Sequence, residues 1–404
     1  MLPDTHPSMC LAVVVVVQNC TEMTRFIINR FIQILITLFL FLTLVFFMIN
    51  AQPGDITNFY ALNPDIPPEA RIKIQNSFGI NDPLWKQYVL YLKNFFSGDL
   101  GVSFSLYPRP VIDIIKERLP RTLVLFLTAA VISFYMGFTL GKIIAWKRGS
   151  VTEYVSTLGG VTLYTVFTPW FGLMIIWLFA FKAGWFPIGK FLDPLLWREA
   201  SVSANSVFNN MLLTAVFVSI FLAVVFIVAL KSRMRRRGWI ISGSVALSLG
   251  VMFFAWSSSG TGYLAIDILK HMVLPIGTLT LISFAGTMLL TRNSMLETMR
   301  EDYVLAARAK GLPDKVVRDK HVARNALLPV VTYFVLSIAF AIDGGVVIET
   351  IFSWPGMGLT LVTAATSEDL PLAVGAFVFT GLFVLVAHLA ADILYAFLDP
   401  RIRY

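Results

Sequence analysis

Residues 301–329 read EDYVLAARAKGLPDKVVRDKHVARNALLP, a polar stretch that lies between two long apolar segments. Its first helix-forming run has acidic residues at the start and basic residues at the end, an order that suits the helix dipole. Gly311 is placed to end that run, because glycine tolerates the left-handed turn of a C-terminal cap. Pro313 suits the first position of a second helix, and Asp314 suits its first turn. The stretch therefore predicts two helices joined by a tight elbow, with a surface too polar for lipid.

The rest of the chain is strongly apolar. Of its 404 residues, 57% are hydrophobic and 14% are charged, whereas a soluble domain carries about 25% charged residues. The net charge of +8 comes from short basic blocks beside apolar runs. That pattern is typical of membrane orientation and argues against a nucleic-acid partner. Membrane lipid is therefore the expected surrounding of most of the chain.

Apolar runs long enough to cross a bilayer, which takes about 20 residues, recur along the whole sequence. The block KSRMRRRG at 231–238 carries five basic residues and no acidic residue, which places it in the cytosol. With that block inside, both termini and residues 301–329 are cytosolic, and residues 350–370, which lack Lys and Arg, lie outside. The sequence thus predicts about eight spans, near 31–50, 121–145, 155–181, 207–230, 239–258, 272–291, 327–349 and 371–398.

The spans divide the chain into segments. We expect an upstream extension at 1–22, a first transmembrane helix at 23–51, an extracytoplasmic segment at 52–120, transmembrane helices two and three at 121–191, a further pair of spans with the basic cytosolic loop at 192–268, and the remaining spans at 269–404, which hold the polar stretch at 293–326.

The extracytoplasmic segment is long enough for helices of its own, expected at 64–79 and between Pro83 and Gly98. The segment could be a cap packed on the membrane domain or a docking surface, and both roles stay open.

Motifs for catalysis or metal binding are missing from the sequence. GFTLGK at 137–142 has three residues between its glycines where a phosphate loop needs four, and Ile143 replaces the Ser or Thr that would hold magnesium. Both cysteines lie in the first twenty residues and the four histidines are scattered, so neither a disulfide framework nor a metal-ligand spacing can be built.

Ionisable residues inside spans are costly and often functional. Asp343 is a candidate for lining a translocation pathway, with a buried pair as the equal alternative. Glu349 is a second pathway candidate, although for Glu349, Asp392 and His388 we favour an interhelix hydrogen bond or an interface position.

The polar stretch resembles the cytoplasmic coupling loop of permease subunits in ABC importers, which is defined by a Glu-Ala-Ala start, a Gly and a later Leu-Pro. Glu301 and Asp302 supply the acidic start, and Ala306, Ala307 and Gly311 match, with the Leu-Pro ending at Pro329. Further stretches are similar to the dipeptide/oligopeptide-type permeases: RFIINRFIQILITLF (25–39), GDLGVSF (98–104), ERLPRTL (117–123), FSWPGMG (352–358) and DPRIR (399–403).

This resemblance implies an all-α membrane protein with the type I ABC importer permease fold. Typical members have six spans, so the pair within 192–268 would be an insertion, expected at the periphery. The chain would be a non-catalytic permease subunit in the inner or plasma membrane of a prokaryote. Its implied partners are a second homologous permease, two cytosolic ATPase subunits that carry the ATP and magnesium, and an extracytoplasmic solute-binding protein. No cofactor is expected in this chain.

The residues that would couple the permease to the ATPase are implied by the same resemblance. Small residues would allow close approach, and charged ones would make polar contacts. The expected coupling residues are Glu301, Ala306, Ala307, Arg308, Gly311 and Pro313.

Two points remain open at this stage. The substrate is expected to be a peptide, with an oligosaccharide or a metal as alternatives, because the solute-binding protein largely sets that choice. An ion-coupled secondary transporter is the alternative class, but it needs a pair of corresponding interrupted helices that the sequence does not show. A membrane-embedded enzyme would need clustered catalytic groups, which are also missing.

Overall fold

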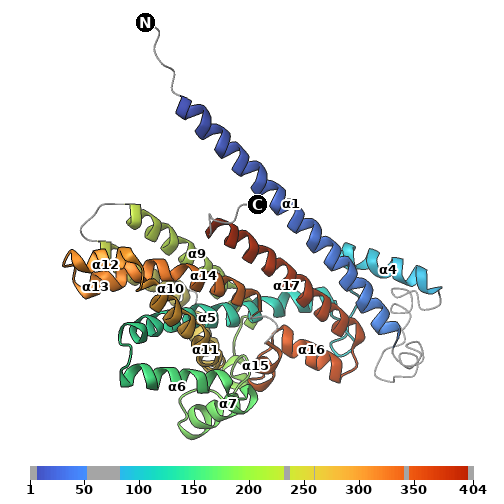
Figure 1. Cartoon of the computed structure of the whole chain (residues 1–404). Helices are drawn as coiled ribbons and strands as arrows, with labels where there is room; N and C mark the ends of the chain where they lie inside the picture. The colour runs from blue at the N-terminus through green and yellow to red at the C-terminus, as the bar shows by residue number, and fades with distance from the viewer. Residues whose placement is uncertain (1–6, 52–81, 232–236, 259, 341–344, 399–404) are drawn as a thin grey trace.

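The computed structural model describes residues 7–51, 82–231, 237–258, 260–340 and 345–398. Throughout these ranges the regular structure is helical, apart from one isolated antiparallel bridge between Val102 and Pro110. Figure 1 shows long helices packed side by side, with short helices gathered at the two ends of the bundle. The expected all-α membrane fold is confirmed.

Six helical stretches in the described ranges are long and apolar enough to cross a membrane. Two of these stretches differ most from the helices that carry them. The first, Ile28–Met48, is only part of α1, and another begins at Asp314, before α14, and ends within α14. The helices that carry these stretches are α1 (Pro7–Asn50), α5 (Val111–Trp146), α9 (Ala204–Lys231), α11 (Gly262–Thr298), α14 (Ala323–Phe340) and α17 (Leu370–Leu398).

The third expected span, at 155–181, is not a straight helix. It consists of α6 (Val151–Thr165) and α7 (Thr168–Ile175), which continues as the π-helix η1 (Ile176–Lys182), and the two parts are bent by 106°. Pro169 lies in the first turn of α7 and has no N–H to bond back to Thr165, so the helix breaks there. The bent pair counts as at most one further span.

The fifth expected span, at 239–258, coincides with α10 (Arg237–Ser258), but its apolar stretch, Ser242–Ser257, is shorter than a spanning helix requires. Within the described residues, six candidate spans and one bent pair therefore stand where the sequence predicted about eight spans.

α5 and α11 pack closely through two glycines. A Cβ at Gly137 would lie 2.6 Å from the carbonyl oxygen of Phe284, and one at Gly141 would lie 2.5 Å from the carbonyl oxygen of Met288. Glycines spaced four residues apart let the backbones of two membrane helices approach in this way. The stretch GFTLGK, which fails as a phosphate loop, is thus a helix-packing motif.

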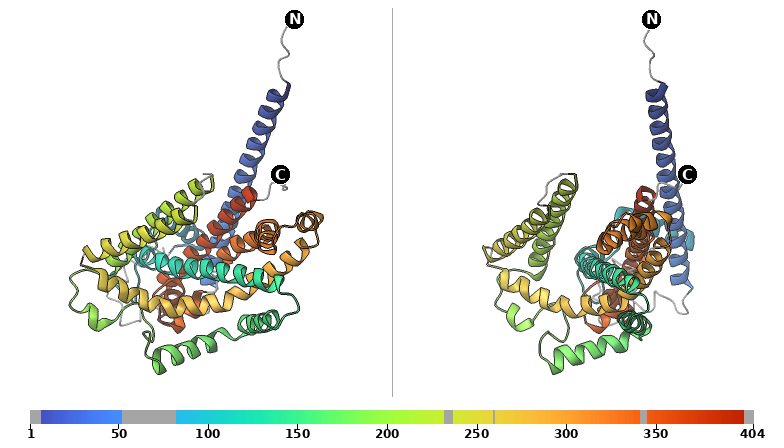
Figure 2. Two further views of the ribbon diagram at one scale, coloured as in Figure 1. Left: turned by 90° about the vertical axis from the view of Figure 1, so that its left-hand side faces the viewer. Right: turned by 60° about the vertical axis from the view of Figure 1, so that its left-hand side comes forward.

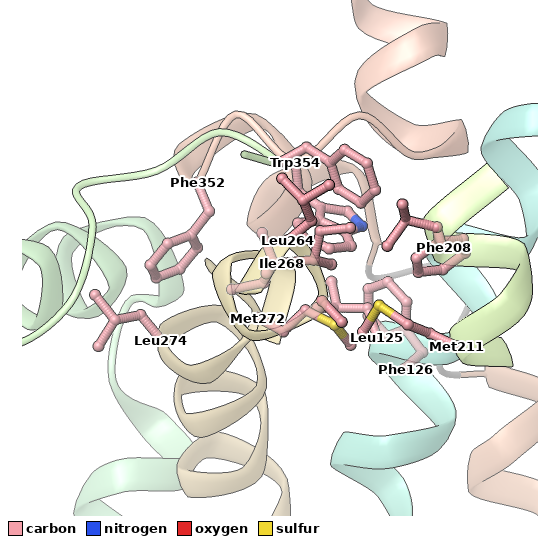
Figure 3. Packing of buried hydrophobic residues seen from close by; sticks show 14 of the residues in the cluster. Leu125, Phe126, Phe208, Met211, Leu264, Ile268, Met272, Leu274, Phe352 and Trp354 are labelled. Atoms are coloured by element: carbon pink, nitrogen blue, oxygen red, sulfur yellow. The ribbon is translucent and has the colours of Figure 1, made fainter. Parts of the chain in front are cut away.

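A hydrophobic cluster joins α5, α9, α11 and the turn after α15 (Gly345–Ile351), as Figure 3 shows. Phe208 and Met211, in the first turns of α9, are buried in it together with Trp354. The rest of the α9–α10 pair leans away from the bundle (Figure 2). The α9–α10 pair is therefore peripheral along most of its length, but the start of α9 is part of the core.

Three further short helices lie at the end of the bundle that holds the outer loops of the expected topology. They are α4 (Leu84–Ser97), α8 (Pro194–Trp197) and α16 (Met357–Thr366). α4 follows Pro83 and ends at Gly98, whose φ of 77° is left-handed, as the sequence predicts. α4 packs on α1. This contact favours the interpretation of the extracytoplasmic segment as a cap on the membrane domain. The helix expected at 64–79 lies outside the described residues.

Candidate functional site

The polar stretch forms α12 (Asp302–Ala309) and α13 (Asp314–Val316), followed by the π-helix η2 (Val317–Val322). Figure 1 shows α12 and α13 at the end of the bundle opposite α4. Gly311 has a φ of 71°, and its N–H donates to the carbonyl of Arg308 at 2.9 Å. The N–H of Leu312 reaches the carbonyl of Ala307 at 3.4 Å. These two bonds close the helix end as a Schellman motif.

The elbow agrees with the sequence prediction, except for one position. Pro313 is the N-cap of α13, with φ −59° and ψ 143°, and so precedes the first helical position rather than occupying it. Asp314 then starts α13, where its charge suits the helix dipole.

One face of α12 is buried against the bundle. Val304 has no exposed surface and Ala307 is 5% exposed. Both pack in a cluster with residues from the ends of α5 and α11 and from η2 and α14. Ala307 is thus turned towards its own chain. The other residues of this cluster are Ala145, Met295, Val317, Val322, Ala323 and Ala326.

The opposite face of α12 is exposed. At 100° per residue, four positions point away from Val304 and Ala307. We call this set the outward face; it consists of Asp302, Leu305, Ala306 and Ala309, all of which are exposed. Leu305 is 56% exposed, although the stretch around it is polar. A small, partly apolar surface on a polar loop is suited to contact with another protein.

Two contacts hold the flanks of α12. The amide nitrogen of Asn325 on α14 donates to the hydroxyl of Tyr303 at 2.7 Å. On the other flank, the guanidinium of Arg308 lies 5.5 Å from the ring centroid of Trp146, the last residue of α5. A cation over an aromatic face is attracted by the ring quadrupole. α12 is therefore fixed to the ends of two spans while its outward face stays open.

The residues after the elbow are tied to α5 as well. Asp319 in η2 accepts from the Nε of Arg318 at 2.9 Å, and its Oδ1 lies 3.2 Å from the Nζ of Lys142 on α5. We call α12, α13 and η2 together the α12–η2 unit. A displacement of this unit would consequently pull on α5 through Lys142 and through Trp146.

The coupling residues expected from the sequence therefore fall into two groups. The first group is exposed to the surroundings and consists of Glu301, Ala306, Arg308, Gly311 and Pro313. Ala307 is inside and seats the helix.

The two pathway candidates have different outcomes. Asp343 lies outside the described residues. Glu349, in α15, is completely buried. It accepts from the Thr122 hydroxyl at 2.6 Å and from the Leu359 N–H at 3.1 Å. These contacts account for Glu349 as an interhelix hydrogen-bonding residue.

The last span carries an ion pair with the first. The carboxylate of Asp392 lies 3.3 Å from Arg30 on α1, with both side chains partly exposed. This is the interhelix contact that the sequence analysis favoured for Asp392.

Sequence analysis missed two polar clusters on the α4 side of the bundle. Arg121 bonds Glu117 at 2.9 Å, contacts Asn205 of α9, and lies 4.2 Å from the ring centroid of Phe191. The spacing of Glu117 and Arg121, four residues apart on a helix, was the available signal.

The second missed cluster is a clasp around Asp369. Its Oδ2 accepts from the backbone N–H groups of Phe104 and Ser105 at 2.9 and 3.0 Å and from the hydroxyl of Ser103. Its Oδ1 accepts from the N–H of Leu372 at 3.2 Å. Asp369 thus caps α17 and holds the segment before α5. An Asp directly before Leu-Pro at a helix start was the signal in the sequence.

Family models match most of the chain. Residues 227–404 match the model described as binding-protein-dependent transport system inner membrane component. Residues 23–126 match the model for the N-terminal part of the membrane component of such transport systems.

Curated relatives cover the chain almost from end to end. The oligopeptide transport system permease protein AppB of Bacillus subtilis is 31% identical over 95% of this chain and 100% of its own length. The dipeptide transport system permease protein DppB of Escherichia coli K12 is 30% identical over 95% of this chain and 99% of its own. The oligopeptide transport system permease protein OppB of Haemophilus influenzae is 29% identical over 95% and 100%.

Proposed function

The chain belongs to the family of binding-protein-dependent transport system inner membrane components, and from this membership we propose that it forms half of the translocation pathway of an ATP-driven peptide importer. The other half would come from a second homologous permease. Peptide is the proposed solute because the similar proteins named above are oligopeptide and dipeptide permeases. An oligosaccharide or a metal is the less supported solute.

The proposed assembly places the chemistry outside this chain. Two cytosolic ATPase subunits would bind ATP and magnesium, and an extracytoplasmic solute-binding protein would deliver the solute. Both termini and α12 would lie in the cytosol, as the basic block at 231–238 indicates. The chain itself would be a non-catalytic subunit of a prokaryotic inner or plasma membrane complex.

The observation that carries the proposal is the division of α12 into two faces. Val304 and Ala307 seat the helix on the ends of the spans, and the outward face is left open. In the proposal the outward face enters a cleft of an ATPase subunit, where Ala306 and Ala309 allow close approach. Glu301 and Arg308 would make polar contacts at its edges, and Gly311 and Pro313 would set the angle of the elbow.

Movement would then pass into the membrane through contacts already described. Closure of the ATPase pair on ATP would draw the α12–η2 unit along with it. Lys142 and Trp146 would carry that displacement to α5, and the spans would rock between inward and outward access. Asp343 keeps its place in the proposal as a pathway-lining acid, whereas Glu349 is assigned to holding α5, α15 and α16 together.

The test is a pair of tryptophan substitutions in the reconstituted complex. Ala306→Trp puts a bulky ring on the outward face, and Lys315→Trp puts the same ring on exposed α13, away from that face. We expect both variants to insert in the membrane, and only Ala306→Trp to lose ATP-dependent peptide uptake in proteoliposomes. Normal uptake by Ala306→Trp would rule out the proposed docking. Uptake driven by an ion gradient without ATP would instead support the ion-coupled alternative.

A further inference from the structure

α4 presents one face to α1. Tyr88, Tyr91 and Phe95 lie on this face at helical spacing, and they pack around Phe46 and its neighbours. The hydroxyl of Tyr88 lies 2.7 Å from that of Thr43, either of which can donate. α4 is thus attached to α1 along one side.

A second face of α4 is apolar and open. Trp85, Val89 and Phe96 point about 100° away from the α1 contact at 100° per residue. Their side chains are 65%, 56% and 67% exposed. The far side of the helix is mainly polar, with Leu90 as an apolar member, and carries Lys86 and Lys93, which are both exposed. Contact, apolar and polar faces therefore follow one another around the helix.

The contact with α1 fixes the depth of α4 relative to a bilayer. The spanning stretch Ile28–Met48 has 21 residues, about 31 Å of helix, which equals the thickness of a hydrocarbon core of about 30 Å. α4 touches this stretch at Thr43, Phe46 and Phe47, no more than five residues, or about 8 Å, from its end. α4 consequently lies where the acyl chains meet the headgroups, on the side remote from α12 (Figure 1).

The surface of α1 beside this contact is apolar as well. It forms a shallow groove whose lining includes Phe47, and the ring of Phe47 stacks on Tyr88 with 6.4 Å between centroids. In a spanning helix such an open apolar surface is suited to contact with acyl chains. The groove is lined by Leu40, Thr43, Leu44, Phe47, Met48 and Ala51.

We propose that α4 is an interfacial anchor that inserts Trp85, Val89 and Phe96 into the leaflet remote from α12. Tryptophan is favoured at this depth because its ring is apolar and its N–H can meet water or headgroups. Lys86 and Lys93, on the polar side, meet lipid phosphates. The membrane would thereby keep the start of the segment between α4 and α5 at a constant depth in the bilayer while the spans move.

The test measures what surrounds each face in the assembled transporter in lipid nanodiscs. On a Cys10→Ser, Cys20→Ser background, nitroxide labels are attached at Trp85→Cys, Val89→Cys and Phe96→Cys. Leu44→Cys on the exposed surface of α1 is the lipid reference, and Lys93→Cys on the polar side of α4 is the water reference. Collision rates are recorded with oxygen, which concentrates in lipid, and with a water-soluble nickel chelate.

We expect the oxygen-to-nickel ratio at positions 85, 89 and 96 to match that at 44 and to exceed that at 93. Nickel accessibility at the three positions equal to that at 93 would overturn the proposal, because the face would then be in water. Low collision rates with both reagents would also overturn it, in favour of a face covered by a second permease or by the solute-binding protein.

Discussion

The hydroxyl of Thr122 on α5 donates to the Oε1 of Glu349 on α15, 2.6 Å away and 227 residues further along the chain. The backbone N–H of Met357 in turn donates to the same hydroxyl at 2.8 Å. One short polar chain thus connects a spanning helix with the FSWPGMG turn. Gly356 belongs to this arrangement, because a Cβ there would collide with both Glu349 and Thr122.

Replacing Glu349 with leucine should destabilise the protein. The Thr122 hydroxyl would remain buried without an acceptor, at a cost of about 1–3 kcal/mol, and the part-buried Leu359 N–H would lose its acceptor as well. Glu349→Gln keeps one carbonyl acceptor and should lose less. Asp392→Asn, at a partly exposed ion pair, is the control, with an expected cost of about 0–1 kcal/mol. Thermal unfolding of the purified complex gives the ranking, and an unchanged Tm for Glu349→Leu would contradict it.

Alanine at Gly141 should be far more harmful than alanine at Gly277. At Gly141 the new methyl group meets the backbone of α11, which cannot rotate away, and overpacking of this kind costs about 1–3 kcal/mol. At Gly277, also within a spanning helix, nothing lies within 4 Å of the added Cβ. There, alanine should be neutral or stabilise the helix by about 0.5–1 kcal/mol.

The matched pair of glycine variants separates helix packing from helix propensity, since both substitutions add the same methyl group. Detergent-solubilised samples compared by thermal unfolding suffice. Equal Tm values for the two variants would mean that α5 and α11 do not approach as described.

Tryptophan at Gly311 should uncouple uptake from ATP hydrolysis without preventing membrane insertion. No atom lies within 4 Å of an added Cβ, so the first carbon of the side chain is not crowded, but φ is 71°, which costs an L-residue about 1–2 kcal/mol. The elbow would therefore relax and turn α12. Gly311→Asn is the control, because asparagine tolerates the left-handed region. The ratio of peptide transported to ATP hydrolysed in proteoliposomes should fall for the tryptophan variant alone; normal uptake by it would refute this role of the elbow.

Local signals in the sequence predicted the elements whose ends depend on single residues. Gly98 and Gly311 both adopt the left-handed conformation that ends a helix, and Pro83 precedes the start of α4. The polar composition around the elbow predicted its place at one end of the bundle. These features follow from backbone chemistry over a few residues, which a single sequence contains.

Features that depend on a distant partner were not predictable in this way. The 106° bend between α6 and α7 was missed because the run 155–181 has no charged residue to divide it, although Pro169 was a usable signal. The burial of Ala307 depends on Val317 and Val322 lying beneath it after the elbow. Composition alone cannot distinguish the buried face of an alanine-rich helix from its exposed face.

The packing of Phe208 and Met211 in one cluster with Trp354 has a consequence for any shortened form of the protein. An insertion held only by its two connections could be cut out and the ends rejoined. Here, excision would remove three buried side chains, those of Val207, Phe208 and Met211, and leave a void in the cluster that holds Trp354. It would also remove Asn205, which contacts Arg121. Deletion of the α9–α10 pair alone would therefore not leave the remaining helices with an intact core.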